Sequence, residues 1–261
     1  MASRATQVVP LEDVVVECHD AKTYRFSADG EPRPGQFLML WIPRRDEVPM
    51  AYSYLRNPMG ITVREYGDAT RALAAEAKKG YRVGVRGPYG NAFAIEGTRA
   101  LAVAGGVGIA SVIAAVEAFA EANIPIETAF GARTKDELML LDRLKVAGAV
   151  HLATDDGTAG HHGFVTDVAA KLLAGGTFDM VLTCGPEVMM KKVVDAANGR
   201  GVPVQASLER YMKCGIGICD ACVLDDRLVC ADGPIFWGEA LAESKDFGHW
   251  RRNICGQRVK A

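Results

Sequence analysis

The chain has 261 residues, of which 49% are hydrophobic, and it carries a formal net charge of -2. This length allows one large or two to three small domains with buried cores. A nearly neutral chain has no sequence-independent attraction for nucleic acid or an anionic membrane, so we expect neither as a partner. Because the N-terminus lacks an apolar signal core, we expect the cysteines to lie in the reducing cytoplasm.

The first 97 residues contain short β-prone runs separated by glycine, proline and charged turns. One helical run, at residues 68–79, interrupts them. Strands that follow one another without helices are typical of a small antiparallel barrel. We therefore predict a small antiparallel β-barrel domain over residues 1–97, with six strands at 8–16, 22–27, 36–42, 51–55, 61–66 and 81–86.

Three places in this barrel suit a flavin. The Tyr52 ring can cover an isoalloxazine face, and the Ser53 hydroxyl can bond its N5 edge. Gly67 and Thr70 open the predicted helix, whose N-terminus can hold a pyrophosphate. The third place is the Pro-Gly-Gln-Phe run at 34–37. Each residue also has a plain structural explanation, since Tyr52 and Ser53 suit any strand and Thr70 suits a simple helix cap.

The barrel ends with Arg-Gly-Pro-Tyr-Gly-Asn at 86–91, and with this run in place the order of segments along the chain resembles that of the ferredoxin-NADP reductase superfamily. The resemblance covers nearly the whole chain and implies bound FAD, with Gly87 among the residues near it. The superfamily motif Arg-x-Tyr-Ser gives an arginine to the flavin phosphates, but this chain has Met50 there. A methionine cannot neutralise a phosphate. The alternatives are weaker FAD binding or another arginine of the barrel, namely Arg56, Arg64 or Arg71.

Strands alternate with helices from Thr98 onward, which predicts a parallel α/β domain over residues 98–205. The predicted strands are 101–104, 126–130, 150–154 and 180–183, and the predicted helices are 111–122 and two that start at Thr166 and Val188. Residues 100–116 carry no charge but contain three glycines, and a membrane span needs about 20 apolar residues. We therefore expect a strand, a turn and a helix in this stretch.

Gly105, Gly106 and Gly108 form the turn between the first strand and helix of this domain. Glycines at such a turn let backbone amides and the helix dipole meet a dinucleotide pyrophosphate. A tight packing turn would use the same residues, so the motif alone leaves both roles open.

The superfamily resemblance assigns roles to two later strand ends. Arg133 would face phosphate or ribose, where a simple ion pair with Asp136 or Glu137 is the structural alternative. Cys184 and Gly185 would border the nicotinamide, although Cys184 without the resemblance is just a small buried side chain.

Two carboxylates, Asp155 and Asp156, follow the third strand of this domain. Relatives selective for NADP carry a positive or hydroxyl side chain here. A carboxylate repels a 2′-phosphate and can accept hydrogen bonds from a free ribose, so we predict NAD rather than NADP. His161 and His162 follow, but no third ligand has metal-site spacing, and we predict a solvated loop.

Four of the seven cysteines lie within seventeen residues, at Cys214, Cys219, Cys222 and Cys230. The C-x4-C-x2-C spacing allows a loop to wrap around an inorganic cluster. Gly215 and Gly217 have no side chains, so the backbone of this loop can approach the cluster closely. We interpret residues 206–261 as a 2Fe-2S domain. A zinc knuckle or a disulfide knot is the alternative, although zinc sites usually have two separated cysteine pairs and disulfide frameworks belong to small secreted domains.

The fourth cysteine follows after seven residues rather than far downstream, and this short return resembles the electron-transfer subunits of dihydroorotate dehydrogenase B. The resemblance implies an FMN-containing catalytic partner that converts dihydroorotate to orotate, and electrons passing through the cluster and FAD to NAD within a hetero-oligomer, a heterotetramer. No catalytic residue of its own is predicted for this chain. The alternatives are a subunit of a hydrogenase, a sulfide dehydrogenase or a ferredoxin-linked transhydrogenase, and a non-enzymatic zinc adaptor.

The remaining features receive no site role. Cys18 and Cys255 lack partners at ligand spacing. The basic C-terminal tail could dock an acidic partner, but a solvated terminus is the simpler expectation.

Overall fold

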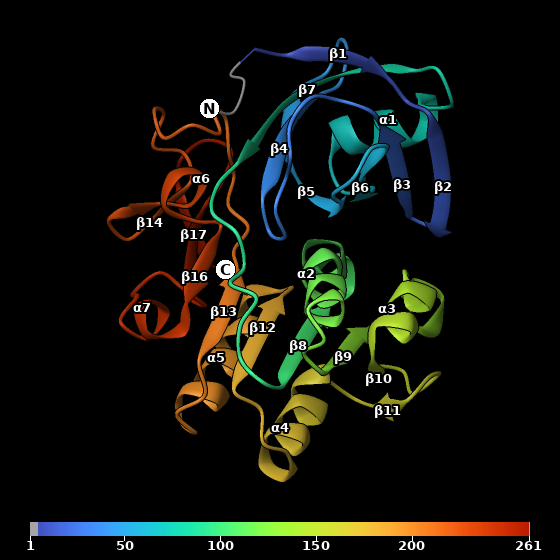
Figure 1. Ribbon diagram of the computed structural model, residues 1–261. Coiled ribbons are helices and arrows are strands. Elements are labelled where there is room, and N and C mark those ends of the chain that lie inside the picture. The colour runs from blue at the N-terminus through green and yellow to red at the C-terminus, as the bar shows by residue number, and fades with distance from the viewer. Residues whose placement is uncertain (1–4, 261) are drawn as a thin grey trace.

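The chain forms two large sheets, one antiparallel and one mainly parallel. The C-terminal segment, residues 208–260, packs beside both of them (Figure 1). The computed structural model describes residues 5–260. Within these residues, one sheet is antiparallel and formed from the first 89 residues, while the other is mainly parallel and formed from residues 100–237. This arrangement confirms the predicted order of a β-barrel followed by an α/β domain.

The antiparallel sheet curves around a core of its own and forms a half-barrel. Its strand order is β1-β7-β4-β5-β6-β3-β2. The strands are β1 (Gln7–Pro10), β2 (Asp13–Cys18), β3 (Ala21–Phe26), β4 (Phe37–Trp41), β5 (Glu47–Tyr54), β6 (Met59–Arg64) and β7 (Arg82–Tyr89). Helix α1 (Asp68–Glu76) connects β6 to β7.

The N-terminal run predicted as one strand is two strands, so that prediction was wrong. Pro10 ends β1, because proline has no N–H with which to continue a ladder. Leu11 then turns into the barrel core, where it is 2% exposed, and β2 begins on a different neighbour, β3. Helix α1 also ends three residues before the predicted boundary, since Lys78, Gly80 and Tyr81 form a turn that hydrogen-bonds to Leu11.

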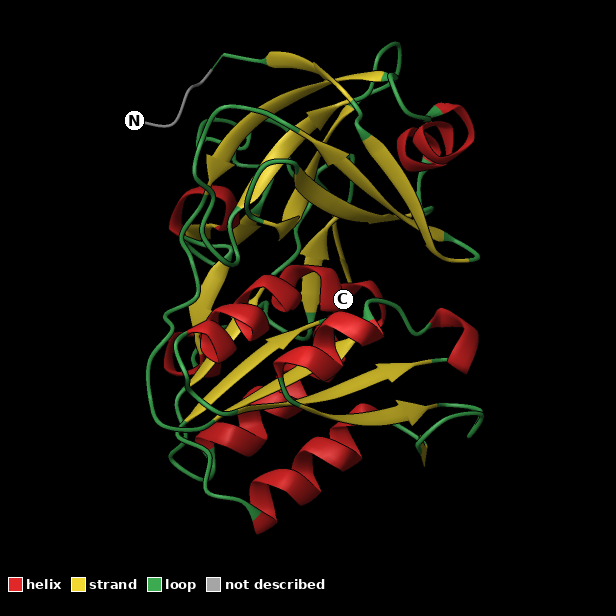
Figure 2. Cartoon of the chain, turned by 45° about the vertical axis from the view of Figure 1, so that its right-hand side comes forward, coloured by secondary structure: helices red, strands yellow, loops and turns green. Residues whose placement is uncertain are grey.

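The second sheet has the order β11-β10-β9-β8-β12-β13-β16. Its strands are β8 (Ala100–Gly105), β9 (Ile126–Ala132), β10 (Ala149–Thr154), β11 (His161–His162), β12 (Met180–Cys184), β13 (Val204–Ser207) and β16 (Ile235–Trp237). Helices lie on both faces (Figure 2). One face carries α2 (Ile109–Glu121) and α3 (Leu141–Ala147), and the other carries α4 (Val165–Gly175) and α5 (Glu187–Asn198).

Short elements differ most from the sequence-based expectation. His161 and His162 form the edge strand β11 rather than a loop, because Gly160, at φ +67°, lets the chain pass against the Leu152 carbonyl, where a Cβ would lie 2.1 Å from the oxygen. Two 3-10 turns, η1 (Gly106–Gly108) and η2 (Lys135–Glu137), occupy strand ends. No helix among residues 5–260 has the length and hydropathy that a membrane crossing requires.

The C-terminal segment is built from short pieces. They are β14 (Val223–Leu224), β15 (Arg227–Leu228), α6 (Val229–Asp232), α7 (Gly238–Ala242), β17 (Trp250–Arg252) and β18 (Arg258–Lys260), together with β16. Strand β16 pairs antiparallel with β13, with Phe236 opposite Ala206, so the segment completes the sheet of the α/β domain. The tail forms the hairpin β17–β18, most of whose residues are exposed, as expected for a solvated terminus, and an Arg258 to Asp246 ion pair of 2.6 Å holds it.

Candidate functional site

The four clustered cysteines come together on one side of the C-terminal segment. Cys214 and Cys219 lie in the loop before β14, Cys222 immediately precedes that strand, and Cys230 is in α6. Cys222 and Cys230 are buried at 2% and 3% exposure, Cys214 is half-buried and Cys219 is exposed. All seven cysteines of the chain are free thiols, so no disulfide knot is present among residues 5–260.

Backbone amides point at these sulfurs. The Ile218 N–H donates to Cys214 Sγ at 3.3 Å, the Gly217 N–H to Cys230 Sγ at 3.2 Å and the Cys230 N–H to Cys222 Sγ at 3.4 Å. Amides aimed at sulfur stabilise negative charge, which a thiolate-bound iron-sulfur cluster carries. The residues present therefore fit a 2Fe-2S cluster.

Two glycines make this loop possible. Gly215 and Gly217 have φ values of +69° and +77°, in the left-handed region that favours glycine. A Cβ on Gly215 would lie 2.7 Å from the Cγ of Met39 on β4. The loop thus packs closely on strand β4 of the barrel.

The same contacts alter the acidity of the thiols. Burial opposes ionisation of Cys214, but hydrogen bonds from the amides of Ile216, Ile218 and Cys219 lower its pKa to about 6. The Cys230 thiol donates to Cys222, which lowers the pKa of Cys222 to about 7 and raises the pKa of Cys230 itself. The Cys214 and Cys222 thiols therefore ionise near neutral pH to thiolates, which are the form that binds iron.

An ion pair of the barrel ties down the cluster loop. Arg86 Nη2 on β7 donates to the Cys214 carbonyl at 3.1 Å, while Nε and Nη2 donate to Glu47 at 2.8 and 2.7 Å. Phe37, Met39 and Tyr89 of the barrel belong to one hydrophobic core with Cys222 and Cys230. The cluster loop is consequently fixed against β4 and β7.

The two turns predicted to hold a nucleotide lie side by side at the ends of β8 and β12. A Cβ on Gly108 would lie 2.5 Å from the Cys184 carbonyl oxygen, and one on Gly185 would lie 2.9 Å from the Gly105 nitrogen. Cys184 is fully buried, and burial raises the pKa of its thiol to about 12. The thiol therefore stays neutral, and the glycines bring two backbone turns into direct contact.

Gly108→Ala should separate these turns. Its methyl group meets backbone rather than a movable side chain, and overpacking of this kind costs about 1–3 kcal/mol. We expect a lower melting temperature and weaker NAD binding, with iron content unchanged, measured by thermal unfolding, nucleotide titration and iron assay. Gly175→Ala at the end of α4 is the control, because no atom lies within 4 Å of its added Cβ. Equal effects of both variants would contradict the expectation.

The predicted adenosine-side residues lie further along the same edge of the sheet. Arg133 follows β9 and pairs with Glu137 at 2.7 Å, as the structural alternative expects. Arg133 also lines an open cavity of about 620 Å³, together with His19, Thr134, Asp136 and Glu137. Asp155 is exposed at the end of the neighbouring strand β10. The described residues thus leave room for a nucleotide beside Arg133.

The predicted flavin residues are placed in two different surroundings. Tyr52 lies in the barrel core at 2% exposure, and the fully buried Ser53 hydroxyl contacts Thr62 Oγ1 at 2.9 Å. Gly67, by contrast, has open space where a Cβ would be, and the Thr70 hydroxyl accepts hydrogen bonds from the amides of Tyr66 and Gly67. The flavin contacts of Tyr52, Ser53, Gly67 and Thr70 all stay predictions.

The structure also shows the positions of Gly87 and of the three arginines that could take the place of the missing flavin-phosphate arginine. Gly87, at φ +148°, would bring a Cβ to 3.2 Å from the Leu38 backbone, so it permits close packing of β7 on β4. Arg56 pairs with Glu121 on the surface, and Arg71 pairs with Asp68 in the first turn of α1. Arg64 is the most enclosed of the three, with 19% of its side chain exposed.

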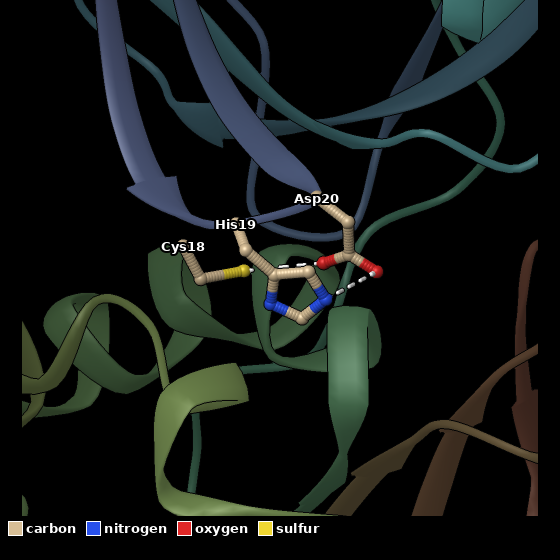
Figure 3. Close-up of side chains that lie close together, drawn as sticks. All are labelled: Cys18, His19 and Asp20. Carbon is tan, nitrogen blue, oxygen red and sulfur yellow. Dashed lines mark hydrogen bonds and ion pairs between the residues drawn. The ribbon is translucent and has the colours of Figure 1, made fainter.

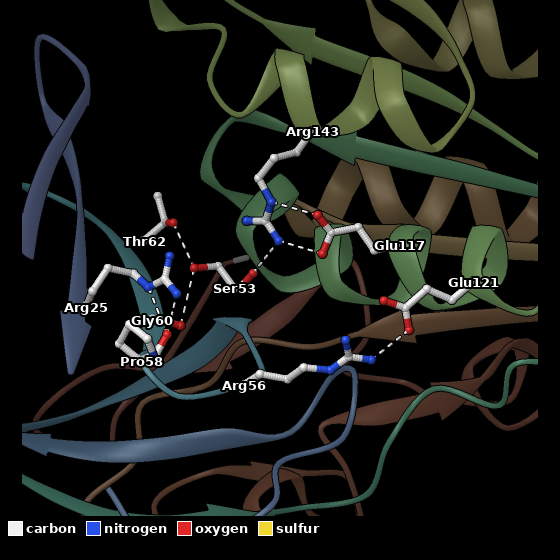
Figure 4. Close-up of polar contacts among 9 residues, drawn as sticks. All are labelled: Arg25, Ser53, Arg56, Pro58, Gly60, Thr62, Glu117, Glu121 and Arg143. Atoms are coloured by element: carbon white, nitrogen blue, oxygen red, sulfur yellow. Dashed lines mark hydrogen bonds and ion pairs between the residues drawn. The ribbon is translucent and has the colours of Figure 1, made fainter. Parts of the chain in front are cut away.

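Sequence reasoning missed a contact that joins the barrel to the α/β domain (Figure 4). Arg143 of α3 donates to Glu117 of α2 at 2.7 and 2.6 Å and to the Ser53 carbonyl of β5 at 2.8 Å. Its guanidinium lies 3.8 Å from the Tyr54 ring centroid, and that of Arg25 lies 3.7 Å from the same centroid. These partners are far apart in sequence and form no motif that could have revealed them.

Comparisons with known proteins concern both the cysteine segment and the α/β domain. The family model for the iron-sulfur cluster binding domain of dihydroorotate dehydrogenase B matches residues 209–242, and the model for the oxidoreductase NAD-binding domain matches residues 102–195. A protein of Methanocaldococcus jannaschii is 45% identical over 251 residues, covering 95% of this chain and 96% of that protein. One of Thermoplasma volcanium is 42% identical over 250 residues, covering 96% of both. Both are named probable dihydroorotate dehydrogenase B (NAD(+)), electron transfer subunit.

Solved structures show the same fold. A chain from a structure of the NADH-dependent reduced ferredoxin-NADP oxidoreductase, described for flavin-based electron bifurcation, has a TM-score of 0.82 and 31% identity, and the match covers 94% of this chain and 92% of that one. The ferredoxin reductase in carbazole 1,9a-dioxygenase has a TM-score of 0.68 at 21% identity, covering 77% and 68%. The second likeness concerns the fold alone.

Proposed function

Since this chain belongs to the family of dihydroorotate dehydrogenase B electron transfer subunits, we propose that it passes electrons between a dihydroorotate-oxidising partner subunit and NAD through a 2Fe-2S cluster and FAD. The observation that carries the proposal is the set of four clustered cysteines: backbone amides donate to the sulfurs of Cys214, Cys222 and Cys230, and these three residues pack in one core with the barrel and the α/β domain. When bound, FAD can exchange both a hydride and single electrons, which links NAD to the cluster.

Each group of residues then has a task. Cys214, Cys219, Cys222 and Cys230 hold the cluster, and the amides of the loop stabilise its charge. The turns at Gly105, Gly106, Gly108 and Gly185 offer backbone to the nucleotide, with Arg133 and Asp155 beside its adenosine half. The N-terminus of α1 at Gly67 and Thr70 holds the flavin pyrophosphate.

The partner meets the chain at the cluster. Cys219 and its neighbour Ile218, which is 75% exposed, are the surface side of the cluster loop. An exposed ligand with an exposed apolar neighbour suits a contact through which electrons pass to a second protein. We place this hetero-oligomer, with an FMN-containing dehydrogenase subunit, in the cytoplasm, where thiolates for the cluster stay reduced.

Anaerobic affinity purification from the native host tests the proposal directly. We expect a brown protein that contains iron, acid-labile sulfide and FAD, and that retains the dehydrogenase subunit. Stoichiometric zinc in a colourless protein would overturn the cluster, while a hydrogenase or sulfide dehydrogenase as the retained subunit would overturn the choice of partner.

Nucleotide choice gives a further expected result. The exposed Asp155 carboxylate at the end of β10 repels a 2′-phosphate, so NADH should reduce the flavin at concentrations at least roughly tenfold below NADPH. Asp155→Ser should narrow that ratio, measured by anaerobic flavin bleaching. Asp142→Ser, an exposed aspartate on α3, should leave the ratio unchanged. Equal efficiency of both nucleotides with the unchanged protein would contradict the prediction.

A further inference from the structure

A positive charge of the barrel, that of Arg86 on β7, lies against the cluster loop. Its Nη2 donates to the carbonyl of Cys214, the first of the four clustered cysteines, at 3.1 Å. Only 13% of the Arg86 side chain is exposed. Water and salt screen an enclosed charge less than one on the surface, so an enclosed charge acts more strongly on its neighbours. The guanidinium therefore acts on a residue that would supply a cluster ligand.

Hydrogen bonds hold each nitrogen of this guanidinium in place. Nε and Nη2 of Arg86 donate to the two carboxylate oxygens of Glu47 at 2.8 and 2.7 Å. Nη1 donates to the Tyr89 hydroxyl at 3.3 Å. The hydrogen bonds to Glu47 raise the pKa of Arg86 although burial opposes its charge, so the side chain stays a cation. Arg86 is thus a fixed positive charge next to the Cys214 carbonyl.

Glu47 on β5 is the counterion of this charge. The Nη2 atom that donates to Glu47 also donates to the Cys214 carbonyl, so the guanidinium joins the carboxylate to the loop. The side chain of Glu47 is 26% exposed, twice the fraction of Arg86. The pair as a whole is neutral, but its positive member is the one that contacts the cluster loop.

A cation in this place affects the energy of reducing a cluster. Reduction of a 2Fe-2S cluster adds one electron and hence one negative charge. The potential at which this happens depends on nearby charge, on hydrogen bonds to the sulfurs and on solvent exposure. The amides of Gly217 and Ile218 supply hydrogen bonds to the sulfurs, whereas Arg86 supplies charge. A positive charge stabilises the reduced state and makes reduction easier.

We infer, building on the proposed function, that Arg86 raises the reduction potential of the cluster from the barrel side and that Glu47, as its counterion, limits this effect. Arg86 acts through its charge and is not a ligand of iron. The potential of the cluster then depends on two strands of the barrel, β5 and β7, as well as on the cysteines themselves.

A second arginine near a cysteine has a different arrangement. Cys18, His19 and Asp20 lie close enough together to suggest a cation site (Figure 3). However, Arg64 Nε donates to Asp20 at 2.6 Å and neutralises it. The Cys18 thiol also donates to Asp20, at 3.2 Å, and burial raises the pKa of this thiol. This group offers a metal neither a thiolate nor an unpaired carboxylate, so we expect no effect of Arg64 on the cluster.

A purely mechanical anchor is the main alternative role for Arg86. In that case Arg86 would only hold the cluster loop against β7, and removing either member of the ion pair would loosen the loop with the same consequence. An effect of charge predicts opposite consequences instead. Arg86→Gln leaves a carboxylate without its cation, whereas Glu47→Gln leaves a cation without its carboxylate.

The test is a redox titration of the complete chain with its cluster and FAD, with dithionite as the reductant and the EPR signal of the reduced cluster as the readout. Arg86→Gln should lower the midpoint potential by roughly 59 mV or more, which for one electron is a tenfold lower ratio of reduced to oxidised cluster. Glu47→Gln should raise the potential. Arg86→Lys keeps the charge and should restore most of the loss. Arg82→Gln, an exposed arginine of the same strand, is the matched control and should cause no shift.

The signs of these shifts decide between charge and anchor. Shifts in the same direction for Arg86→Gln and Glu47→Gln, or an Arg86→Lys loss as large as that of Arg86→Gln, would overturn the inference in favour of an anchor. If Arg86→Gln loses its cluster, Glu47→Gln decides, because a raised potential supports the inference and an unchanged or lowered one overturns it. Equal potentials in all variants would contradict the inference alone. Absence of an EPR signal from the reduced, unchanged protein would contradict the proposed function and the inference with it.

Discussion

Replacing Cys222 with serine should remove the cluster, lowering iron from about two atoms per chain to fewer than about 0.2. Cys222 is buried and supplies one of the four proposed thiolate ligands, whereas a serine hydroxyl stays protonated near neutral pH and is a poor ligand for iron. FAD should remain, because the N-terminus of α1 lies in the barrel. Iron and sulfide assays with the flavin absorbance spectrum measure both parts.

Cys255→Ser is the matched control for this loss. Cys255 is an exposed cysteine in the turn of the β17–β18 hairpin and lies outside the spacing of the four ligands. Iron content should be the same as in the unchanged protein. A Cys222→Ser protein that keeps its full iron content would remove Cys222 from the ligand set.

Electron transfer from dihydroorotate should depend wholly on the partner subunit. The isolated chain should pass electrons from NADH to artificial acceptors but produce no orotate, because its two sheets serve flavin and nucleotide and the C-terminal segment serves the cluster. Adding the FMN-containing subunit of the same organism should establish dihydroorotate-dependent NADH formation. Absorbance at the NADH band, followed with and without that subunit, measures the effect.

The Cys222→Ser chain, added to the same assay, tests whether electrons pass through the cluster. It should bind the partner if the cluster loop keeps its surface, yet it should yield no NADH from dihydroorotate. Orotate formation by the isolated chain would contradict the division of labour. Full NADH formation by the Cys222→Ser mixture would show that electrons bypass the cluster.

The sequence was most informative where a function depends on close spacing along the chain. The cysteine run from Cys214 to Cys230 and the glycine turn at Gly105 to Gly108 are local patterns, and the structure forms both as compact loops. The alternation of strands and helices after Thr98 also predicted the parallel sheet, because buried parallel strands are continuous apolar runs.

Contacts between segments distant in sequence could not be predicted in this way. Arg86 and the Cys214 carbonyl are 128 residues apart, and Arg143 and the Ser53 carbonyl are 90 apart. No periodicity or spacing connects such pairs. The surroundings of Tyr52 could not be predicted either: the structure places its ring among the barrel-core residues, and its flavin contact stays a prediction. Which face a strand residue uses depends on the sheet that surrounds it.

The pairing of β16 with β13 restricts how this chain can be recombined with its relatives. The C-terminal segment supplies the edge strand β16 of the second sheet, so it cannot be replaced independently of that sheet. Removing it exposes the backbone edge of β13 and the apolar side chains that Phe236 covers. Chimaeras joined just after β13, at Ser207, should therefore aggregate unless the donor segment brings a matching strand. Chimaeras that exchange β13 together with the cluster segment should keep their sheet intact.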